Sequence, residues 1–507
     1  MSNFTLLIVG TSVYLAVCIG IGIWSSTRKV VKASDFFLAG HSFGPVVLSL
    51  AMMATVFSAW FILGHQGTTW KFGFPYIAHF MHVPLLGITG AVFFPRLWAI
   101  CRKNGYITPS ELYGEYFGGE MMRILVIVVA VLYAIPYVAL QLRGAGFVFN
   151  TLSGGEIPVV TGSIVLGTAV IVYVFLGGLR AAALTDTIQG ILLLCGAAIL
   201  AFTTMTAVGA ATGQSFITAL SESIKAAGTP YYTLPEFGEM YSMLFILSSS
   251  IVIAGINFSP PYMMIIASAK SPKIFRFQCV VVMMIVMGFF YYIFTPMIGI
   301  GGRSVVHELA NLDSLSLNII FNYMGPVAFL ITALGVLAAM NSTAAGYLAN
   351  TSTIFARDLY CRYINQEASP RKQVFVGRFM ILFIVILAVL FSMVFLDLLT
   401  ILGSLATSIG LQMAPAMFGV TYCPKITRKG VEWGIIAGLI AVILTYFVWR
   451  YPLGIHMGGW GLLANIIVCW QVSKRTPKPS KEAIERTHVM FEEKRVGRVS
   501  APQMTAK

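Results

Sequence analysis

The sequence predicts an all-α protein that crosses a membrane many times, and three observations carry this prediction. Of its 507 residues, 58% are hydrophobic and only 10% are charged, whereas soluble proteins carry about 25% charged residues. Apolar stretches long enough to cross the ~30 Å hydrocarbon core as helices recur along the chain. Lysines and arginines gather in alternate connections between these stretches, as they do in multi-pass membrane proteins.

Thirteen apolar stretches are predicted to be transmembrane helices. They lie near residues 5–25, 46–66, 76–99, 122–149, 157–176, 184–208, 243–268, 276–300, 323–356, 375–395, 397–421, 431–450 and 456–473. The first lacks a preceding basic residue, so we expect it to be retained and not cleaved as a secretory signal. The transmembrane domain is expected over 1–473, with core helices at about 46–421, and a cytoplasmic basic tail over 474–507. That tail is too short for a nucleotide-binding domain.

The distribution of basic residues predicts how the chain sits in the membrane. An odd number of spans places the two ends on opposite sides. With the N-terminus extracellular or periplasmic, 28 of the 33 Lys and Arg residues fall on the cytoplasmic side, as the positive-inside rule requires. We therefore expect a cell (inner) membrane protein with a cytoplasmic C-terminus. The net charge of +14 then reflects topology and anionic lipid, and no nucleic-acid partner is expected.

One span carries features that interrupt a helix at mid-membrane, which is a pointer to a transporter's binding site, and a second span is unusually polar. The span 243–268 contains Gly255 to Pro261, where two prolines remove backbone donors. We expect the helix to open there, and a simple proline kink is the alternative. The span 46–66 lacks proline but is polar for its depth. If these two spans each begin a five-helix unit, one helix leads the ten core helices and two follow them.

The span that follows Pro326 is uncharged for 31 residues, up to Ala356, yet its middle is rich in polar side chains. These are Asn341, Ser342, Thr343, Asn350, Thr351, Ser352 and Thr353. Polar groups inside a membrane are costly and usually face the bundle or a solute path. We therefore expect this span to carry function.

Four motifs occur in order along the chain. They are Ser34–Pro45; Thr108–Leu112 with Phe117-Gly118; Gly177–Gly190; and Leu337–Thr343 followed by Ala356–Tyr360. They resemble motifs of the sodium:solute symporter family, which contains bacterial proline, galactose, sialic acid and monocarboxylate carriers. The resemblance implies thirteen helices, a LeuT-like inverted repeat of five plus five helices, and Na⁺-coupled import of a small organic solute by alternating access. It implies no cofactor beyond the coupling ion.

Carried over position by position, the resemblance implies a sodium site. Its ligands would be the backbone carbonyls of Ala54, Phe57 and Ala339 and the hydroxyls of Ser342 and Thr343. A hard cation prefers oxygen ligands, and adjacent residues point about 100° apart on a helix, so both hydroxyls can reach one ion at a helix–helix seam. The alternative is that each hydroxyl bonds back to a carbonyl of its own helix.

Acidic residues favour sodium over a proton as the coupling ion. Of nineteen Asp and Glu residues, Asp186 is the only one that falls inside a predicted span beyond its first two residues, whereas a proton-coupled carrier usually needs a buried carboxylate relay. The resemblance gives Asp186 a role in sodium passage or gating, and a helix N-cap is the alternative. Residues 350–353 lie further toward the cytoplasm and are expected to line the ion's exit.

Six side chains in the spans 46–66, 122–149 and 243–268 are candidate substrate ligands. They are Ser58, Trp60, Gln141, Arg143, Asn257 and Ser259. Arg143 would suit a carboxylate, or it would snorkel to the outer surface. Proline carriers of the family have an aspartate where this chain has Val56, so proline itself is not expected. The substrate is predicted to be a small carboxylate, either a monocarboxylate or an amino acid.

Other functions and ligands are less compatible with the sequence. A membrane solute sensor that retains the transporter fold is the alternative function. No HExxH or GxSxG motif indicates an enzyme. His79 and His82 are three residues apart but lack a third ligand, and seven scattered cysteines form no CxxC pair, so Na⁺ is the one metal ion expected.

Overall fold

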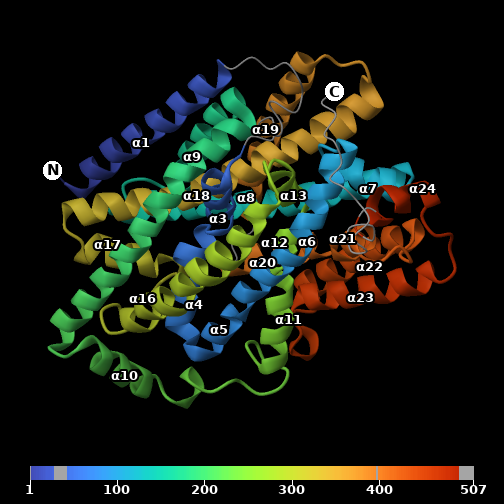
Figure 1. Ribbon diagram of the computed structural model, residues 1–507. Coiled ribbons are helices and arrows are strands. Elements are labelled where there is room, and N and C mark those ends of the chain that lie inside the picture. The colour runs from blue at the N-terminus through green and yellow to red at the C-terminus, as the bar shows by residue number, and fades with distance from the viewer. Residues whose placement is uncertain (1, 28–42, 395–397, 490, 492–507) are drawn as a thin grey trace.

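The fold is a bundle of long helices, seen in a computed structural model that describes residues 2–27, 43–394, 398–489 and 491 (Figure 1). The motif at 34–45 lies mostly outside the described residues. The elements that cross the bundle are α1 (Asn3–Ser26), the bent pair α3 (Pro45–Val56) and η2–α4 (Trp60–Phe72), α5–α6 (Phe74–Asn104), α8 (Glu120–Leu152), α9 (Val159–Thr212), the bent pair α11–α12 (Met243–Phe258) and α13 (Pro260–Ala267), α14–α16 (Lys273–Gly302), α18 (Pro326–Ile354), α19 (Pro370–Val394), α20–α21 (Leu399–Thr421), α22 (Arg428–Phe447) and α23 (Met457–Ser473).

These elements account for the thirteen predicted crossings. Within the described residues, nine helices are long and apolar enough to cross a membrane, and two bent pairs pass the same test together. Helix α9 has 54 residues, which is about 80 Å at 1.5 Å per residue and enough for two crossings. The shorter apolar helix α23 adds one more. The prediction of an all-α, multi-pass membrane protein is confirmed.

Helix α9 differs from the predicted pair of spans at 157–176 and 184–208. No loop separates the two halves, and the helical conformation is interrupted at Gly178 alone, where φ is +58° and ψ is −148°. Glycine adopts this backbone conformation without the steric cost that a Cβ would bring. The next residues include three consecutive alanines, Ala181 to Ala183, which are strong helix formers. The expected loop is therefore helical.

Two five-helix units follow one another along the chain. The first runs from α3 to the end of α9 and the second from α11 to α21, with α1 before them and α22 and α23 after. Each unit begins with a broken helix, and both breaks bend the chain by 53°. This is the arrangement that the sequence predicts from the spans 46–66 and 243–268.

The break in the second unit lies where the prolines predict it. Helix α12 (Gly255–Phe258) ends before Ser259, whose backbone is extended with φ −65° and ψ 136°. Pro260 then occupies the first position of α13, where a missing N–H costs no helical hydrogen bond. Two separate helical pieces replace a simple kink at this place.

Two connecting segments are also ordered. The long connection at 209–242 contains the helix α10 (Phe216–Ala227) and a short 3₁₀ turn. The first part of the predicted tail forms α24 (Lys481–Ile484) and η10 (Glu485–Val489), which pack near α7 (Pro109–Phe117). The Tyr116 hydroxyl lies 3.0 Å from Nε2 of His488, so this part of the tail is held against the bundle.

The broken helix α12 crosses α20 (Leu399–Leu411) at very short distance. A Cβ atom added to Gly255 would lie 2.0 Å from the carbonyl oxygen of Thr407 and 2.8 Å from the amide nitrogen of Leu411. A Cβ added to Gly410 would lie 2.6 Å from the Gly255 carbonyl oxygen. Two glycines therefore allow the two backbones to touch beside the break.

Replacing Gly255 with alanine is expected to destabilise the protein, because the added methyl group collides with backbone that cannot rotate away. The cost of such overpacking is about 1–3 kcal/mol, and thermal unfolding in detergent should show a lower Tm. Gly288→Ala is the matched control, since a Cβ there meets no atom within 4 Å. Equal Tm values for the two variants would contradict the close crossing.

Candidate functional site

The site begins at the break in the first unit, between Val56 at the end of α3 and Trp60 at the start of η2. Phe57 has φ −74° and ψ 88°, which is outside the helical region. Residues at such a break have backbone carbonyls and amides that a continuous helix would otherwise pair internally. All three residues of the break, Phe57 to Ala59, are buried.

A side chain from a distant helix supports the break. Oε1 of Gln141, on α8, accepts a hydrogen bond from the Ala59 amide nitrogen at 2.9 Å, and its Nε2 donates to the Tyr137 carbonyl at 3.1 Å. The Trp60 amide donates to the Ser58 hydroxyl oxygen at 3.2 Å. These bonds satisfy buried amides that lost helical partners, as buried backbone groups require.

Oxygen atoms of α3 and α18 meet across a seam next to the break. The Ser342 hydroxyl lies 3.0 Å from the Ala54 carbonyl oxygen and 3.1 Å from that of Ala339. The Thr343 hydroxyl lies 3.1 Å from the Ala54 carbonyl, 3.3 Å from that of Thr55 and 3.0 Å from that of Ala339. Each hydroxyl thus faces its own helix and α3 at once.

This cluster has more oxygen acceptors than hydrogens to share. Three carbonyls and two hydroxyls converge, and each hydroxyl can donate its single hydrogen to one acceptor at a time. A cation would satisfy the remaining lone pairs, because hard cations prefer oxygen ligands. The five oxygens carry no formal charge, so they suit a monovalent ion better than calcium, whose protein sites usually include carboxylates.

Phe57 and Asp186 lie near this seam in different ways. Phe57 is the residue at which α3 ends, and its ring packs edge-on against Phe61 with centroids 4.2 Å apart. Asp186 is buried in α9, and its Oδ1 has no hydrogen-bond partner in the described part of the chain. It lies eight residues beyond the break at Gly178, more than two helical turns, so the alternative of a helix N-cap is wrong.

A polar network connects α1, α9 and α18 beside the same seam. The side-chain amides of Gln189 and Asn341 both donate to the Tyr14 hydroxyl, at 2.7 and 2.8 Å. The Tyr173 hydroxyl donates to Asn341 Oδ1 at 3.3 Å. The side chain of Asn341, the residue before Ser342, is therefore hydrogen-bonded within this network.

The polar residues at 350–353 divide into two pairs. The hydroxyls of Ser352 and Thr353 donate back to the Ala349 carbonyl within α18, at 2.9 and 2.8 Å. The side chains of Asn350 and Thr351 are buried and have no hydrogen-bond partner among the described residues. Their expected place on an ion exit path stays a prediction.

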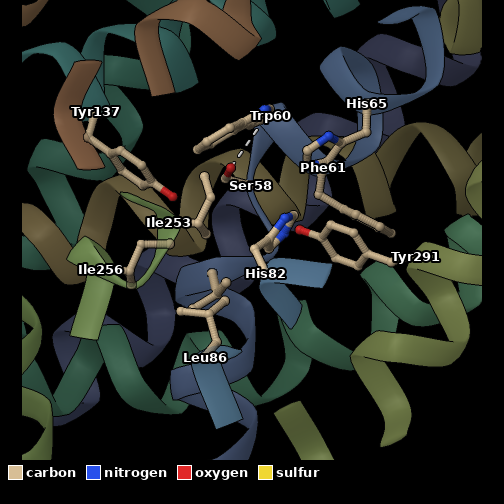
Figure 2. A pocket seen from close by; sticks show the side chains of 11 residues that line it. Ser58, Trp60, Phe61, His65, His82, Leu86, Tyr137, Ile253, Ile256 and Tyr291 are labelled. Carbon is tan, nitrogen blue, oxygen red and sulfur yellow. Dashed lines mark hydrogen bonds between the residues drawn. The ribbon is translucent and has the colours of Figure 1, made fainter. Parts of the chain in front are cut away.

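A small cavity lies on the other side of the break (Figure 2). It is lined by Val56, Ser58, Trp60, Phe61, His65, His82, Leu86, Tyr137, Ile253, Ile256 and Tyr291. Both broken helices therefore contribute to one cavity, α3–η2 from the first unit and α11–α12 from the second. Its free volume of about 10 Å³ is space for about one water molecule, so a larger ligand requires the surrounding helices to move apart.

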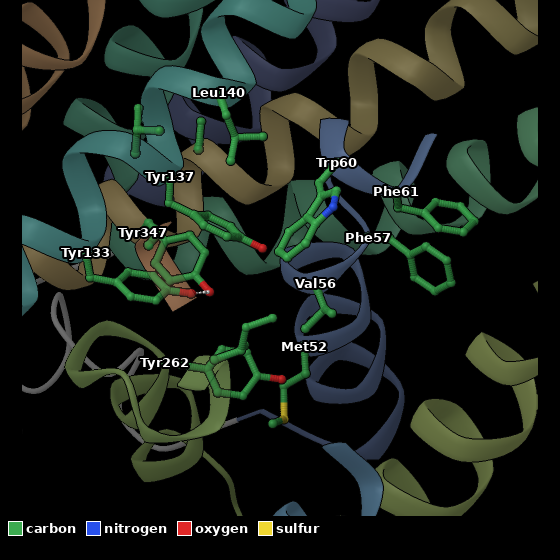
Figure 3. Close-up of a cluster of buried hydrophobic side chains, with 14 of the residues drawn as sticks. Met52, Val56, Phe57, Trp60, Phe61, Tyr133, Tyr137, Leu140, Tyr262 and Tyr347 are labelled. Atoms are coloured by element: carbon green, nitrogen blue, oxygen red, sulfur yellow. Dashed lines mark hydrogen bonds between the residues drawn. The ribbon is translucent and has the colours of Figure 1, made fainter. Parts of the chain in front are cut away.

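Aromatic side chains form much of the cavity wall. Trp60, Phe61, Tyr137 and Tyr291 line the cavity. Tyr347, which does not line it, packs against Tyr137 with ring centroids 4.8 Å apart (Figure 3). The hydroxyls of Tyr133 and Tyr347 lie 2.9 Å apart. The Trp60 Nε1 and the Tyr137 hydroxyl are buried without a hydrogen-bond partner in the described structure, so the cavity presents unused donors.

Histidines occupy the opposite wall of the cavity. Nδ1 of His65 lies 2.6 Å from the Tyr76 hydroxyl, and Nδ1 of His82 lies 2.8 Å from the His79 carbonyl oxygen. Figure 2 shows the Tyr291 hydroxyl directed toward the His82 ring. In the described residues, no group of three or more His, Cys, Asp or Glu side chains is placed to hold a metal ion.

Of the six predicted substrate ligands, the structure places Ser58 and Trp60 in the cavity wall and the other four outside it. Gln141 instead accepts a hydrogen bond from the Ala59 amide at the break. The Asn257 amide donates to the Leu86 carbonyl and the Thr89 hydroxyl, at 2.9 and 2.7 Å. The Ser259 hydroxyl donates to the Ile256 carbonyl of its own helix. These three side chains have structural partners.

Arg143 also lies away from the cavity. Its guanidinium is 5.4 Å from the centroid of the Phe147 ring on the same helix, and its charge acts on Asp313 in the connection before α18. This placement agrees with the alternative that the side chain reaches toward the end of α8. Arg143 is therefore not carried into the proposal for the substrate site.

Asp313 connects that end of the bundle to α20. Its Oδ2 accepts a hydrogen bond from the amide nitrogen of Leu399, the first residue of α20, at 3.1 Å. Burial raises the pKa of Asp313 to about 6, although the Leu399 amide and the Arg143 guanidinium favour the charged carboxylate. The carboxylate thus caps a helix of the second unit at a cost in desolvation.

Comparisons with known proteins agree on one family. The model of the "Sodium:solute symporter family" matches residues 36–438. The osmoregulated proline transporter OpuE of Bacillus subtilis is 24% identical over 96% of this chain and 98% of its own length. The sodium/pantothenate symporter of Escherichia coli is 23% identical over 68% of this chain and 71% of its own length.

A solved structure has the same fold. A Na⁺-coupled sialic acid symporter, in a substrate-bound outward-open state, superposes with a TM-score of 0.77, at 18% identity, over 94% of this chain and 99% of the other. This likeness confirms the predicted LeuT-like fold of two five-helix units.

The buried carboxyl of Asp313 is expected to make stability depend on pH. Because its pKa is about 6 in the folded protein and about 3.9 in an unfolded chain, the folded state binds the proton more tightly. Stability should therefore rise, by up to about 3 kcal/mol, as the pH falls from about 6 to about 4. Asp313→Asn keeps an acceptor for Leu399 and should remove this rise in thermal unfolding. Parallel pH profiles for variant and wild type would contradict it.

Proposed function

The chain belongs to the sodium:solute symporter family, and on that premise we propose that it imports a small monocarboxylate together with Na⁺ by alternating access. The solutes for which its relatives are named, proline, pantothenate and sialic acid, all carry a carboxyl group. The observation that carries the proposal is the break in α3. It presents backbone oxygens to α18 on one side and hydrogen-bond donors to a closed cavity on the other.

Sodium would bind at the seam between α3 and α18. Its proposed ligands are the carbonyl oxygens of Ala54, Phe57 and Ala339 and the hydroxyls of Ser342 and Thr343. The short oxygen–oxygen distances across the seam support Ala54, Ala339, Ser342 and Thr343, since the two hydroxyls face the Ala54 and Ala339 carbonyls. The third carbonyl that they face is that of Thr55, and Phe57 is kept in the proposed set from the family resemblance. Asp186, buried nearby in α9, is proposed to act in sodium passage or gating.

The residues of the cavity wall favour a solute with an anionic head group and an uncharged carbon chain. Ser58, Trp60 and Tyr137 supply donors for a carboxylate, while Val56 and Ile253 supply apolar surface for a short carbon chain. None of the eleven lining residues carries a carboxylate, so the ammonium group of an amino acid would lack a charged partner. A monocarboxylate is therefore favoured over an amino acid.

The proposed ion also favours an anionic solute. Ser58 lies four residues after Ala54, so a sodium ion at the seam would place a positive charge close to the head of the solute. Opposite charges attract more strongly in a buried site than in water. The proposed orientation places the N-terminus outside the cell, as the distribution of basic residues predicts, so that the sodium gradient drives uptake.

Uptake into proteoliposomes tests the proposed substrate. Under an imposed Na⁺ gradient, radiolabelled acetate, propionate or pyruvate is expected to accumulate, with little accumulation of proline. Tyr137→Phe should raise the half-saturating solute concentration about tenfold, the scale of losing one hydrogen bond to a charged group. Tyr323→Phe is the control, because its hydroxyl bonds to the Val305 carbonyl far from the cavity. Accumulation of none of these acids would contradict the proposal.

The dependence of uptake on Na⁺ tests the proposed ion site. Ser342→Ala and Thr343→Ala are each expected to raise the half-saturating Na⁺ concentration about tenfold or more, because each removes one ligand of the ion. Ser163→Ala and Thr204→Ala are matched controls, since those buried hydroxyls bond only to their own helices. Unchanged Na⁺ dependence in both site variants would remove the assignment, as would equal uptake in Na⁺, Li⁺ and K⁺.

A further inference from the structure

A second, much larger cavity lies away from the two broken helices' shared site. It is a groove of about 820 Å³ between α6, α21 and α23, which appear together on the right of Figure 1. Its walls consist of Phe93, Phe258, Ala414, Pro415, Phe418, Cys423, Lys425, Ile426, Leu462, Ile466, Cys469, Trp470, Ser473, Lys474, Thr476 and Lys478. Most of these side chains are apolar, and three are lysines.

The groove follows one face of α23. Leu462, Ile466, Cys469 and Ser473 are spaced three or four residues apart, so they lie on the same face of that helix. From Leu462 to Ser473 the helix rises about 16 Å. This is about half of the ~30 Å hydrocarbon core, so the groove is as long as one leaflet of a bilayer is deep.

All three lysines lie at one end of the groove. Lys474 and Lys478 follow the end of α23, and Lys425 precedes α22; the Thr427 amide bonds to the Ser473 hydroxyl at 3.2 Å and so joins the two segments. Nζ of Lys474 lies 3.3 Å above the centre of the Trp470 ring.

Within the described residues, none of these three lysines forms an ion pair with a carboxylate. Glu482, four residues after Lys478, forms no ion pair with these lysines in the described structure, and Glu432, seven residues after Lys425, is paired with Arg428 and Lys429, at 3.8 and 3.1 Å. The groove thus combines an apolar interior with a basic mouth.

From these features we propose that the groove binds one anionic phospholipid. An acyl chain would lie along the apolar face of α23, and the phosphate headgroup would bind Lys425, Lys474 and Lys478. Lysines at a membrane surface attract anionic headgroups, and an apolar wall one leaflet long is complementary to a lipid tail. Trp470 lies at the boundary between the two parts, where its ring contacts the chain and the lysine above it.

The inner end of the groove gives the lipid a route to the transport core. Phe258 is the last residue of α12, directly before the break at Ser259. Its ring packs edge-on against Phe93 of α6, with centroids 5.2 Å apart. A lipid tail in the groove therefore contacts the broken helix of the second unit from the side opposite to the substrate cavity.

Fluorescence quenching by brominated lipid tests the proposal. The full-length protein is placed in phosphatidylcholine vesicles that contain increasing amounts of either brominated phosphatidylglycerol or brominated phosphatidylcholine. The part of the quenching that Trp470→Phe removes reports the groove. We expect this part to reach half-saturation at a phosphatidylglycerol fraction about tenfold lower than the corresponding phosphatidylcholine fraction, given three lysines near the headgroup.

Two triple variants of equal charge separate a specific site from general attraction to the surface. Lys425→Gln, Lys474→Gln and Lys478→Gln together should abolish the preference for phosphatidylglycerol. Lys103→Gln, Lys273→Gln and Lys372→Gln remove three exposed lysines outside the groove and should leave it unchanged. The proposal would be overturned by a Trp470-dependent part of the quenching that is equal for the two lipids in the wild type. Loss of preference in both triple variants, or Trp470→Phe curves identical to those of the wild type, would also overturn it.

Discussion

The rest of the structure depends on the exchange of backbone partners at the break in α3. Three residues, Phe57 to Ala59, leave the helix, and their buried polar groups must find partners elsewhere. Gln141 of α8 accepts from the Ala59 amide, and the hydroxyls of Ser342 and Thr343 meet the Ala54 carbonyl from α18. Three helices that are far apart in the sequence are thereby held around one point.

The second broken helix completes the same site from the other unit. Its break at Ser259 is set by local chemistry, because Pro260 cannot continue a helix from the preceding residue. The contact between α12 and α20, in which Gly255 lies against Thr407, brings Ile253 and Ile256 to the cavity that Ser58 and Trp60 also line. Because both pairs are bent by 53°, each unit begins with a broken helix that faces the cavity.

Features encoded locally could be predicted from the sequence, and features created by tertiary contacts could not. The opening at Ser259 follows from its prolines, and the thirteen crossings follow from hydropathy. The break in α3 has no proline, and it depends on Gln141, 82 residues away. Asn257 is polar and lies beside the break, but its amide donates to α6 and does not line the cavity. The spacing of residues in the sequence does not reveal this direction. Tyr137 could have been predicted as a cavity residue, because it lies one turn before the candidate Gln141 on α8. Nothing in the sequence around Tyr291 indicates that it lines the cavity.

In the proposed mechanism, the shared break explains why ion and solute would move together. Sodium bound to the Ala54 carbonyl and solute bound at Ser58 would both favour the conformation in which α3 is broken at Phe57–Ala59. Each would then raise the affinity for the other by the same factor, because coupling between two binding sites is reciprocal. The free volume of about 10 Å³ is too small for the solute, so binding and release require the helices around the break to separate. The broken helices are the elements able to do this, since the helical conformation is already interrupted at Phe57 and at Ser259.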